Sequence, residues 1–432
     1  MTDASREASQ WWPSRRLRLF LLLGILVALV AGIGLDIWAG RRVDAEFARL
    51  EKRYGSLDGR SVVAPAVPAD DNRARFVRAA VALTVPANHD KSYSALLASF
   101  TRFEKLPESS HVPDDVRAFV DANREAIRLA DEARNRHQSS WGVDYGGGDN
   151  PPLLGIRTLS NAIYFAALLD IEAGRPDDAS RRIASGLAVT TSMQQEPALL
   201  PQLIRIAVAV PQCEAVRRLI VQSEPSRAAL EDLAHGLVEN RKPDPMQVGI
   251  LGEMRHGNEA LRTLETGRVT RLSDFASVST WVGPLARIGR PLVRLVRINY
   301  LHEMERLIEL QAGPRPRPPF PDSARPGVWH WRRFSYMFTA GLERAMDAGD
   351  QFNSMLGATE LGVGLRRYRL DHGTYPDDLS ALVPAYLLRL PVDAVTGRPP
   401  AYARRGAGFT LKAEAVRRYS FANSALAWTV PK

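Results

Sequence analysis

The uncharged, apolar run from Leu19 to Leu35 is the feature that most constrains the fold of this chain. At ~1.5 Å of rise per residue, a helix of this length reaches most of the way across a ~30 Å hydrocarbon core, and Ile37 and Trp38 extend it to the interface. A cleaved signal peptide is the alternative interpretation. Its apolar region is usually shorter and ends at a small-x-small site, for which Gly32-Ile33-Gly34 is a poor match. We therefore expect an uncleaved transmembrane helix at 19–38.

Basic residues flank this span on both sides in nearly equal number, so loop charge alone does not decide its orientation. We expect the N-terminus inside, because everything after residue 38 then forms one exported body. The predicted location is the inner (cytoplasmic) membrane, with a single pass and an extracytoplasmic body.

The composition is that of a folded body, with 45% hydrophobic and 24% charged residues. Cys213 is the only cysteine, which excludes an intramolecular disulfide and a cysteine metal cluster. The net charge of +9 would suit nucleic acid in the cytosol, whereas an exported body meets anionic lipid, cell-wall polymer or acidic protein. The expected partners are the membrane and other envelope proteins, with no nucleic acid. The sequence predicts no oligomeric state.

Beyond the span, apolar residues recur at helical spacing up to Tyr54, which predicts an amphipathic stalk that ends at Gly55. Two prolines then indicate a linker, and Asp70 or Asp71 is positioned to cap the next helix. A later proline-rich stretch predicts a second, extended linker. The expected divisions are a cytoplasmic tail (1–18), the transmembrane helix (19–38), stalk and linker (41–69), a helical domain (70–311), the proline-rich linker (312–327), and a long helix with a small β module (328–432).

Two apolar stripes between Leu159 and Met193 face each other across a turn at Gly174–Asp178, which predicts an αα-hairpin. With the small Ala179 where the helices approach, the hairpin resembles one tetratricopeptide unit. A solenoid needs several stacked units, and no second copy occurs at the expected period. The predicted fold class is therefore mainly α, with this tetratricopeptide-like hairpin inside a helical bundle.

Four arginines line one side of a further predicted helix at positions i, i+3, i+7 and i+10, opposite an apolar side. A basic amphipathic helix of this kind lies on anionic lipid, each near-surface charge contributing ~1 kcal/mol. The alternative is a solvated face opposite the core. The candidate membrane-surface residues are Arg287, Arg290, Arg294 and Arg297.

The C-terminal segment combines a long helix with short β-prone runs. The helix is expected from about Phe338 to Asp371, with Gly373 as a left-handed cap. Turn residues and a strand from Phe409 to Lys412 then indicate a small antiparallel hairpin or sheet. The expected module is one helix followed by a small β element.

This order of residues resembles the C-terminal module of the major pseudopilins of type II secretion systems, over about 361–411. In that family a helix ending in Asp-x-Gly-x-Tyr-Pro leads through a Leu-Pro-x-Asp turn and a Tyr-containing strand into a small sheet. The matching residues are Asp371, Gly373, Tyr375, Pro376, Leu390, Pro391, Asp393, Gly397 and Tyr402.

The chain departs from that family in two respects. Its apolar span lies far upstream of the module without a prepilin-peptidase site, so the resemblance does not imply pilus assembly. The family's calcium loop is not recognisable after Gly408, so no ligand carries over. The whole chain also resembles uncharacterised membrane-anchored helical proteins of bacterial envelopes, for which resemblance supplies no activity.

No motif for zinc, phosphate or nucleophilic chemistry is present in the sequence. Asp144 and Asp149, in a glycine-rich segment, carry oxygens that calcium accepts, but their spacing fits no calcium loop and a turn explains the composition equally well. The leading hypothesis is an anchored extracytoplasmic structural or interaction protein, associated with an envelope or secretion assembly, with no cofactor and no metal. The alternative is an anchored envelope hydrolase with a dispersed acidic site, for which Asp144 and Asp149 are the candidate acids.

Overall fold

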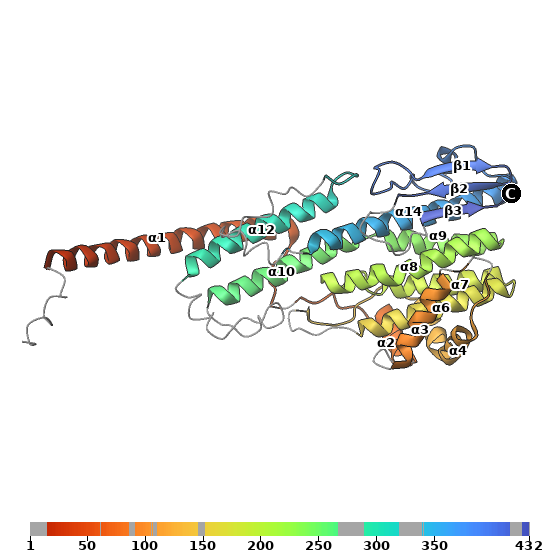
Figure 1. Ribbon diagram of the computed structural model, residues 1–432, viewed down its shortest axis with the longest axis horizontal. Helices are drawn as coiled ribbons and strands as arrows, with labels where there is room; N and C mark the ends of the chain where they lie inside the picture. Colours follow the sequence, from red (N-terminus) through yellow and green to blue (C-terminus); the bar gives the residue numbers. More distant parts are fainter. Residues whose placement is uncertain are drawn as a thin grey trace, which may run out of the picture. The chain divides into compact units, whose positions relative to one another are not determined.

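A computed structural model describes residues 15–60, 62–85, 91–104, 106, 110–145, 152–266, 289–318, 339, 341–414 and 426–431. Within them the chain is mainly helical with one small antiparallel sheet near the C-terminus, which confirms the predicted fold class at this level (Figure 1). The chain forms two compact units. Unit 1 comprises Met1–Leu57, Gly257–Glu303 and Arg325–Phe338, and unit 2 comprises Asp58–His256, Met304–Ala324 and Thr339–Lys432.

The helices vary widely in length. They are α1 (Arg15–Tyr54), α2 (Arg73–Ala82), α3 (Lys91–Glu104), α4 (Asp114–Ala122), α5 (Arg124–Ala133), α6 (Leu153–Glu172), α7 (Pro176–Thr191), α8 (Leu199–Gln222), α9 (Arg227–Arg241), α10 (Pro245–Glu265), α12 (Arg290–Ala312), α14 (Leu342–His372) and the 3-10 helix η4 (Leu379–Leu382).

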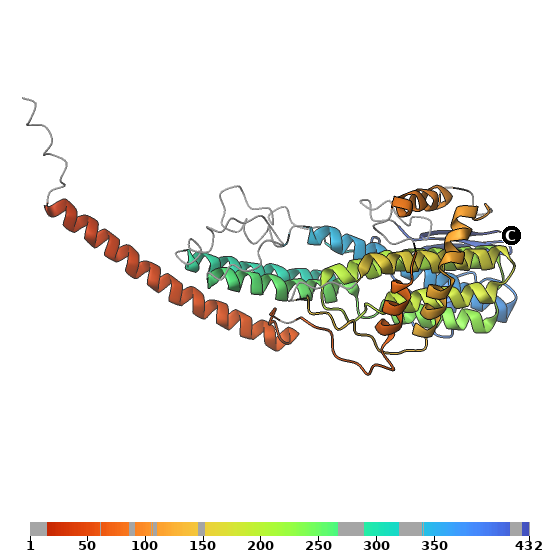
Figure 2. The same ribbon diagram turned by 90° about the horizontal axis from the view of Figure 1, so that it is seen from below.

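Helix α1 of unit 1 is uninterrupted over 40 residues (Figure 2). Its apolar part is fully exposed, and the helix is long and apolar enough to span a membrane or to act as a signal sequence. It ends at Gly55, where φ is +78° and the N–H donates to Glu51 O at 2.9 Å, as the sequence predicts. Helix α8 passes the same test of length and composition, but 56% of its apolar window is buried inside the protein, as in a core helix.

The second half of α1 packs against α12 within unit 1. Val43 and Leu50 are buried, the Arg297 guanidinium lies 5.8 Å from the centre of the Phe47 ring, and His302 Nε2 lies 3.0 Å from Glu46 Oε1. The apolar stripe predicted beyond the span is therefore the packing face of α1.

The core of unit 2 is a stack of antiparallel helices. Helix α6 packs on α7 and α8, α7 packs on α9, and α14 covers α8 and α9 (Figure 1). The turn between α6 and α7 has Gly174 at φ +69°, and Pro176 begins α7. Asp177 and Asp178 lie in the first turn of α7, where the positive end of the helix dipole stabilises acidic side chains. The predicted αα-hairpin is present in the structure.

The sheet of unit 2 has the order β1-β2-β3, with β1 (Ala401–Arg405), β2 (Gly408–Lys412) and β3 (Ala427–Val430) all antiparallel. Strand β2 covers the predicted strand. Trp428 of β3 is buried against α14, where Gly362 leaves no room for a Cβ atom. The sheet therefore rests directly on the helix that leads into it.

Candidate functional site

The C-terminal motif predicted from the sequence begins at the end of α14. Gly373 has φ +72° and its N–H donates to Arg369 O at 2.8 Å, which makes it the left-handed cap that the sequence predicts. Just before it, Asp371 pairs with Arg227 and accepts a hydrogen bond from Tyr386 Oη at 2.6 Å. The hydrogen bond from Arg227, together with that from Tyr386, lowers the pKa of Asp371 to about 2.

The motif tyrosines connect this cap to the sheet. Tyr375 is buried, with its ring 4.8 Å from that of Phe409 and its hydroxyl accepting from Arg366 Nη1 at 3.1 Å. Tyr402 Oη donates to Pro376 O at 2.6 Å, which ties β1 to the residues after the cap. Both side chains are engaged within the fold, so their role in the structure is to fix the sheet on α14.

Asp393 organises the turn that follows Pro391. Its Oδ1 accepts from the N–H groups of Val395 and Thr396, both at 2.8 Å, and its Oδ2 accepts from the N–H of Glu414, also at 2.8 Å. The side chain is 1% exposed. This carboxylate therefore closes the turn and joins it to the end of β2.

The other motif residues complete this turn. Gly397 adopts φ +69° and donates to Asp393 O at 2.9 Å, and Pro391 packs where a Cβ on Gly357 would lie only 2.9 Å away. Leu390, which directly precedes Pro391, is half-buried. The structure thus gathers the predicted motif around the last part of α14, where the interactions just described stabilise the fold.

A groove that the sequence analysis missed lies beside this turn. It is a cavity of about 560 Å³ between α9, α14 and the segment 386–391. Its floor is apolar and includes Leu387, which lies close enough to Gly364 that a Cβ added there would be in ordinary contact with the leucine side chain. Two large apolar residues at its edge face solvent: Leu388 is 87% exposed and Val238 is 54% exposed. The only sequence signal was the Leu387-Leu388 pair inside a turn-rich segment.

The rim of this groove is predominantly basic. Arg241 makes two hydrogen bonds to Glu360, at 2.8 and 2.7 Å, so this pair is neutralised. Among the described residues, the side chains of Lys242 and Arg389 have no acidic partner. An apolar floor with unneutralised cations at the rim is suited to binding a chain segment.

The predicted membrane-surface arginines are engaged in ion pairs within unit 1. Arg290 pairs with Asp36 of α1, and Arg294 lies 2.9 Å from Asp36 and 2.6 Å from Glu265. Arg297 Nη1 lies 3.1 Å from Glu265. Arg287 is outside the described residues. Contact of this helix with lipid remains a prediction.

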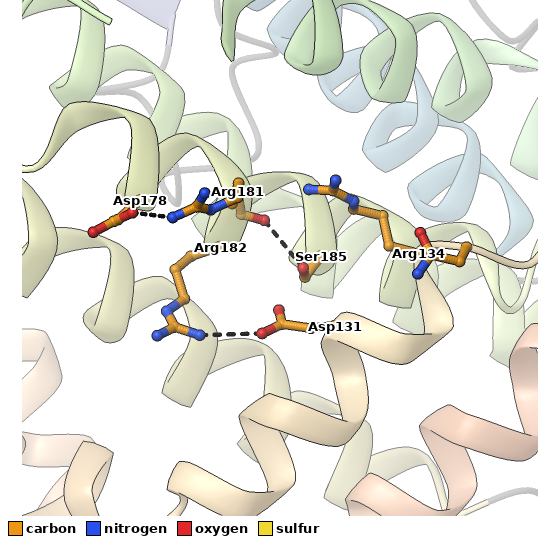
Figure 3. A pocket seen from close by; sticks show the side chains of 7 residues that line it. Asp131, Arg134, Asp178, Arg181, Arg182 and Ser185 are labelled. Carbon is orange, nitrogen blue, oxygen red and sulfur yellow. Dashed lines mark hydrogen bonds and ion pairs between the residues drawn. The ribbon is translucent and has the colours of Figure 1, made fainter. Parts of the chain in front are cut away.

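A second, strongly polar pocket of about 450 Å³ lies between α5 and α7 (Figure 3). Arg182 lies 3.2 Å from Asp131, Arg181 pairs with Asp178, and Ser185 Oγ donates to Arg181 O at 3.0 Å. Arg134, at its edge, pairs with Asp232 at 3.1 Å. The three arginines of this pocket are thus each paired with an acid, Arg181 and Arg182 within the pocket and Arg134 outside it.

The structure describes only one of the two acids proposed for a hydrolase, so this pair stays a prediction. Asp144 Oδ1 accepts from Val62 N–H at 3.0 Å, and Asp149 lies outside the described residues. Glu196 is fully buried, where it accepts from Trp141 N–H at 2.9 Å and from Tyr145 Oη at 2.7 Å. Burial raises the pKa of Glu196. Over the same part of the chain, no group of His, Cys, Asp and Glu is placed to hold a metal ion.

Comparison of the sequence with protein-family models and with curated proteins, and of the structure with solved structures, gives no match.

Proposed function

We propose that this chain is a membrane-anchored, extracytoplasmic interaction protein that binds a partner in the groove between α9, α14 and 386–391. The observation that carries this proposal is Leu388, which is 87% exposed beside an apolar cavity of 560 Å³. Burying a leucine side chain contributes roughly 1.5–3 kcal/mol, and single exposed leucines are common. An exposed leucine and an exposed valine on one cavity are a better sign of a binding surface.

The proposed anchor is α1, whose apolar segment is exposed among the described residues. We place the N-terminus in the cytoplasm because everything after the span, unit 2 included, then forms one exported body; the basic residues that flank the span are too evenly divided to decide its orientation. The pseudopilin-like motif supports an association with an envelope or secretion assembly. No enzymatic activity is part of this proposal.

Topology can be tested with single introduced cysteines. Burial raises the pKa of the native thiol, Cys213, to about 12, so a membrane-impermeant maleimide should leave it unlabelled. In intact cells stripped of their outer membrane, Lys432→Cys should react and Thr2→Cys should not. The reverse labelling, or a mature chain that begins near Leu35, would contradict the proposed anchor.

Binding can be tested by native electrophoresis of mildly solubilised membranes. The wild-type chain should migrate in a complex that contains a second polypeptide, and Leu388→Asp should release it. Leu370→Asp is the matched control, because Leu370 is also exposed, at 44%, on α14 but outside the groove. Identical migration of the wild type and both variants would contradict a role for the groove.

A further inference from the structure

We infer that the occupant of the groove is an acidic, amphipathic segment of a partner protein. This inference rests on the proposed function, and it adds the chemistry of the partner. The groove has the two elements that such a segment requires, an apolar floor and a cationic rim, and both lie within unit 2.

The apolar part of the groove is a cavity that can enclose side chains, and not a flat surface. The cavity of 560 Å³ lies within the range of roughly 300–1,000 Å³ typical of pockets that enclose a ligand. Val238 on α9 and Leu388 in the segment after η4 stand on either side of it. A helix that lays apolar residues spaced by three or four positions into such a groove would cover both.

The charges at the rim determine which charge the bound segment should carry. The titratable lining residues are His235, Arg241, Lys242, Glu360, Arg367, Tyr386 and Arg389. Glu360 is the acidic member of this set, and Arg241 neutralises it. Arg367 forms a long ion pair, at 3.9 Å, with the exposed Glu231. Lys242 and Arg389 therefore contribute a positive potential that no described acid cancels, and low-dielectric apolar walls strengthen its effect on a bound carboxylate.

The same charges argue against a second copy of this chain as the occupant. Each copy carries a net charge of +9, so two copies repel each other as they approach. An acidic segment is attracted by the rim and gains the apolar contact once bound. Its affinity should therefore fall as the salt concentration rises, because screening weakens the charged contribution and leaves the apolar one.

The test uses the full chain in its native membrane, with the photoreactive amino acid p-benzoylphenylalanine at position 388 and, as the control, at position 370. The crosslinked peptide of the partner is then mapped by mass spectrometry. We expect an intermolecular crosslink from position 388 only, to a segment with an excess of Asp and Glu and with apolar residues at helical spacing. Charge reversal by Lys242→Glu together with Arg389→Glu should reduce the crosslink yield roughly tenfold. Arg405→Glu, an exposed change in β1, should leave it unaltered.

Four results would overturn the inference: a crosslink to this chain or to a second copy of it, a crosslink to lipid, a partner segment without acidic excess, or no crosslink specific to position 388. Equal yields for the charge-reversed and control variants would also overturn it. If Leu388→Asp releases a complex while the crosslinked segment is not acidic, the proposed function stands and this inference fails. Circular dichroism of each variant verifies that it is folded.

Discussion

The two oxygens of Asp393 have separate tasks in the structure, and replacement by asparagine should separate them. Oδ1 accepts from Val395 and Thr396, whereas Oδ2 accepts from Glu414 at the end of β2. Asparagine retains one acceptor oxygen, which should stay on the turn because it satisfies two donors there. The amide nitrogen that replaces Oδ2 is a donor, so it cannot accept from Glu414.

The expected magnitude follows from the one interaction that Asp393→Asn removes. A hydrogen bond to a charged group contributes about 1.5–3 kcal/mol, and 1.4 kcal/mol corresponds to a factor of ten in an equilibrium constant. Exchange of the Glu414 amide for deuterium should therefore become roughly tenfold to a hundredfold faster, while Val395 and Thr396 change much less. Asp393→Ala should accelerate exchange at all of these amides. Hydrogen–deuterium exchange with site-level fragmentation measures each amide separately.

A matched control is Asp377→Asn, because Asp377 is 89% exposed and pairs with Arg404 at the surface. Exposed pairs contribute about 0–1 kcal/mol, so exchange throughout the module should be nearly unchanged. The reasoning would be refuted if Asp393→Asn protected Glu414 as well as the wild type does, or if asparagine and alanine had equal effects on all of these amides.

Three further outcomes are expected. Gly373→Val should lower the free energy of unfolding by about 1–2 kcal/mol, because a valine is strained at φ +72°; no atom lies near the added Cβ, so the loss reports the backbone alone. Gly364→Ala is the control, because its Cβ would lie in ordinary contact distance of Leu387, and it should not lower this free energy. Urea unfolding compares the two variants. Burial raises the pKa of Glu196 above 4.5, so the protonated side chain contributes stability below that pH, and this contribution is lost as the pH rises through the raised pKa. Glu196→Gln should remove this pH-dependent loss of stability. Equal pH profiles of unfolding for the wild type and the variant would contradict the prediction. A chain without residues 1–38, which keeps the part of α1 that packs against α12, should stay in solution without detergent and give a helical circular dichroism spectrum, which insolubility or a mainly β spectrum would contradict.

The sequence predicted the end of a helix where one residue, a glycine, determines it. Gly55 and Gly373 end helices because both need a positive φ, which glycine adopts without strain. Capping by side chains was less predictable. The first helix of the body is capped by Asn72, whose Oδ1 accepts from Ala74 N–H at 3.1 Å, and not by Asp70 or Asp71. Asp71 instead accepts from His137 N–H at 3.0 Å, a partner that no local pattern reveals.

The start of the long helix shows the same limit. The apolar pattern suggested a start at about Phe338, whereas α14 begins at Leu342 after Gly341, which has φ +94°. The proline-rich stretch was expected to be an extended linker, and its ion pairs with α14 were not visible in the sequence: Arg315 lies 2.9 Å from Asp350 and Arg317 lies 2.6 Å from Asp347. Proline content predicts an extended backbone, but it does not tell whether neighbouring arginines find carboxylates on another element.

The arginine stripe was visible in the sequence, and its partners were not. Asp36 lies in another helix more than two hundred residues upstream of Arg290, so no spacing rule connects them. The groove was missed for a related reason. Its edges come from α9, α14 and the segment 386–391, and an exposed leucine is recognisable only once its neighbours are known to leave it uncovered.

The motif and the groove are mechanically related, because the interactions that fix the module also hold Leu388 in place. On one side, the N–H groups of Tyr386 and Leu387 donate to Leu382 O at 2.9 and 3.0 Å, and the Tyr386 hydroxyl is bound to Asp371. On the other side, Asp393 closes the next turn. A backbone segment that is already ordered loses little conformational freedom on binding, whereas fixing the backbone of one residue otherwise costs about 1–2 kcal/mol. Residues with a purely structural role thereby determine how strongly an exposed leucine can bind.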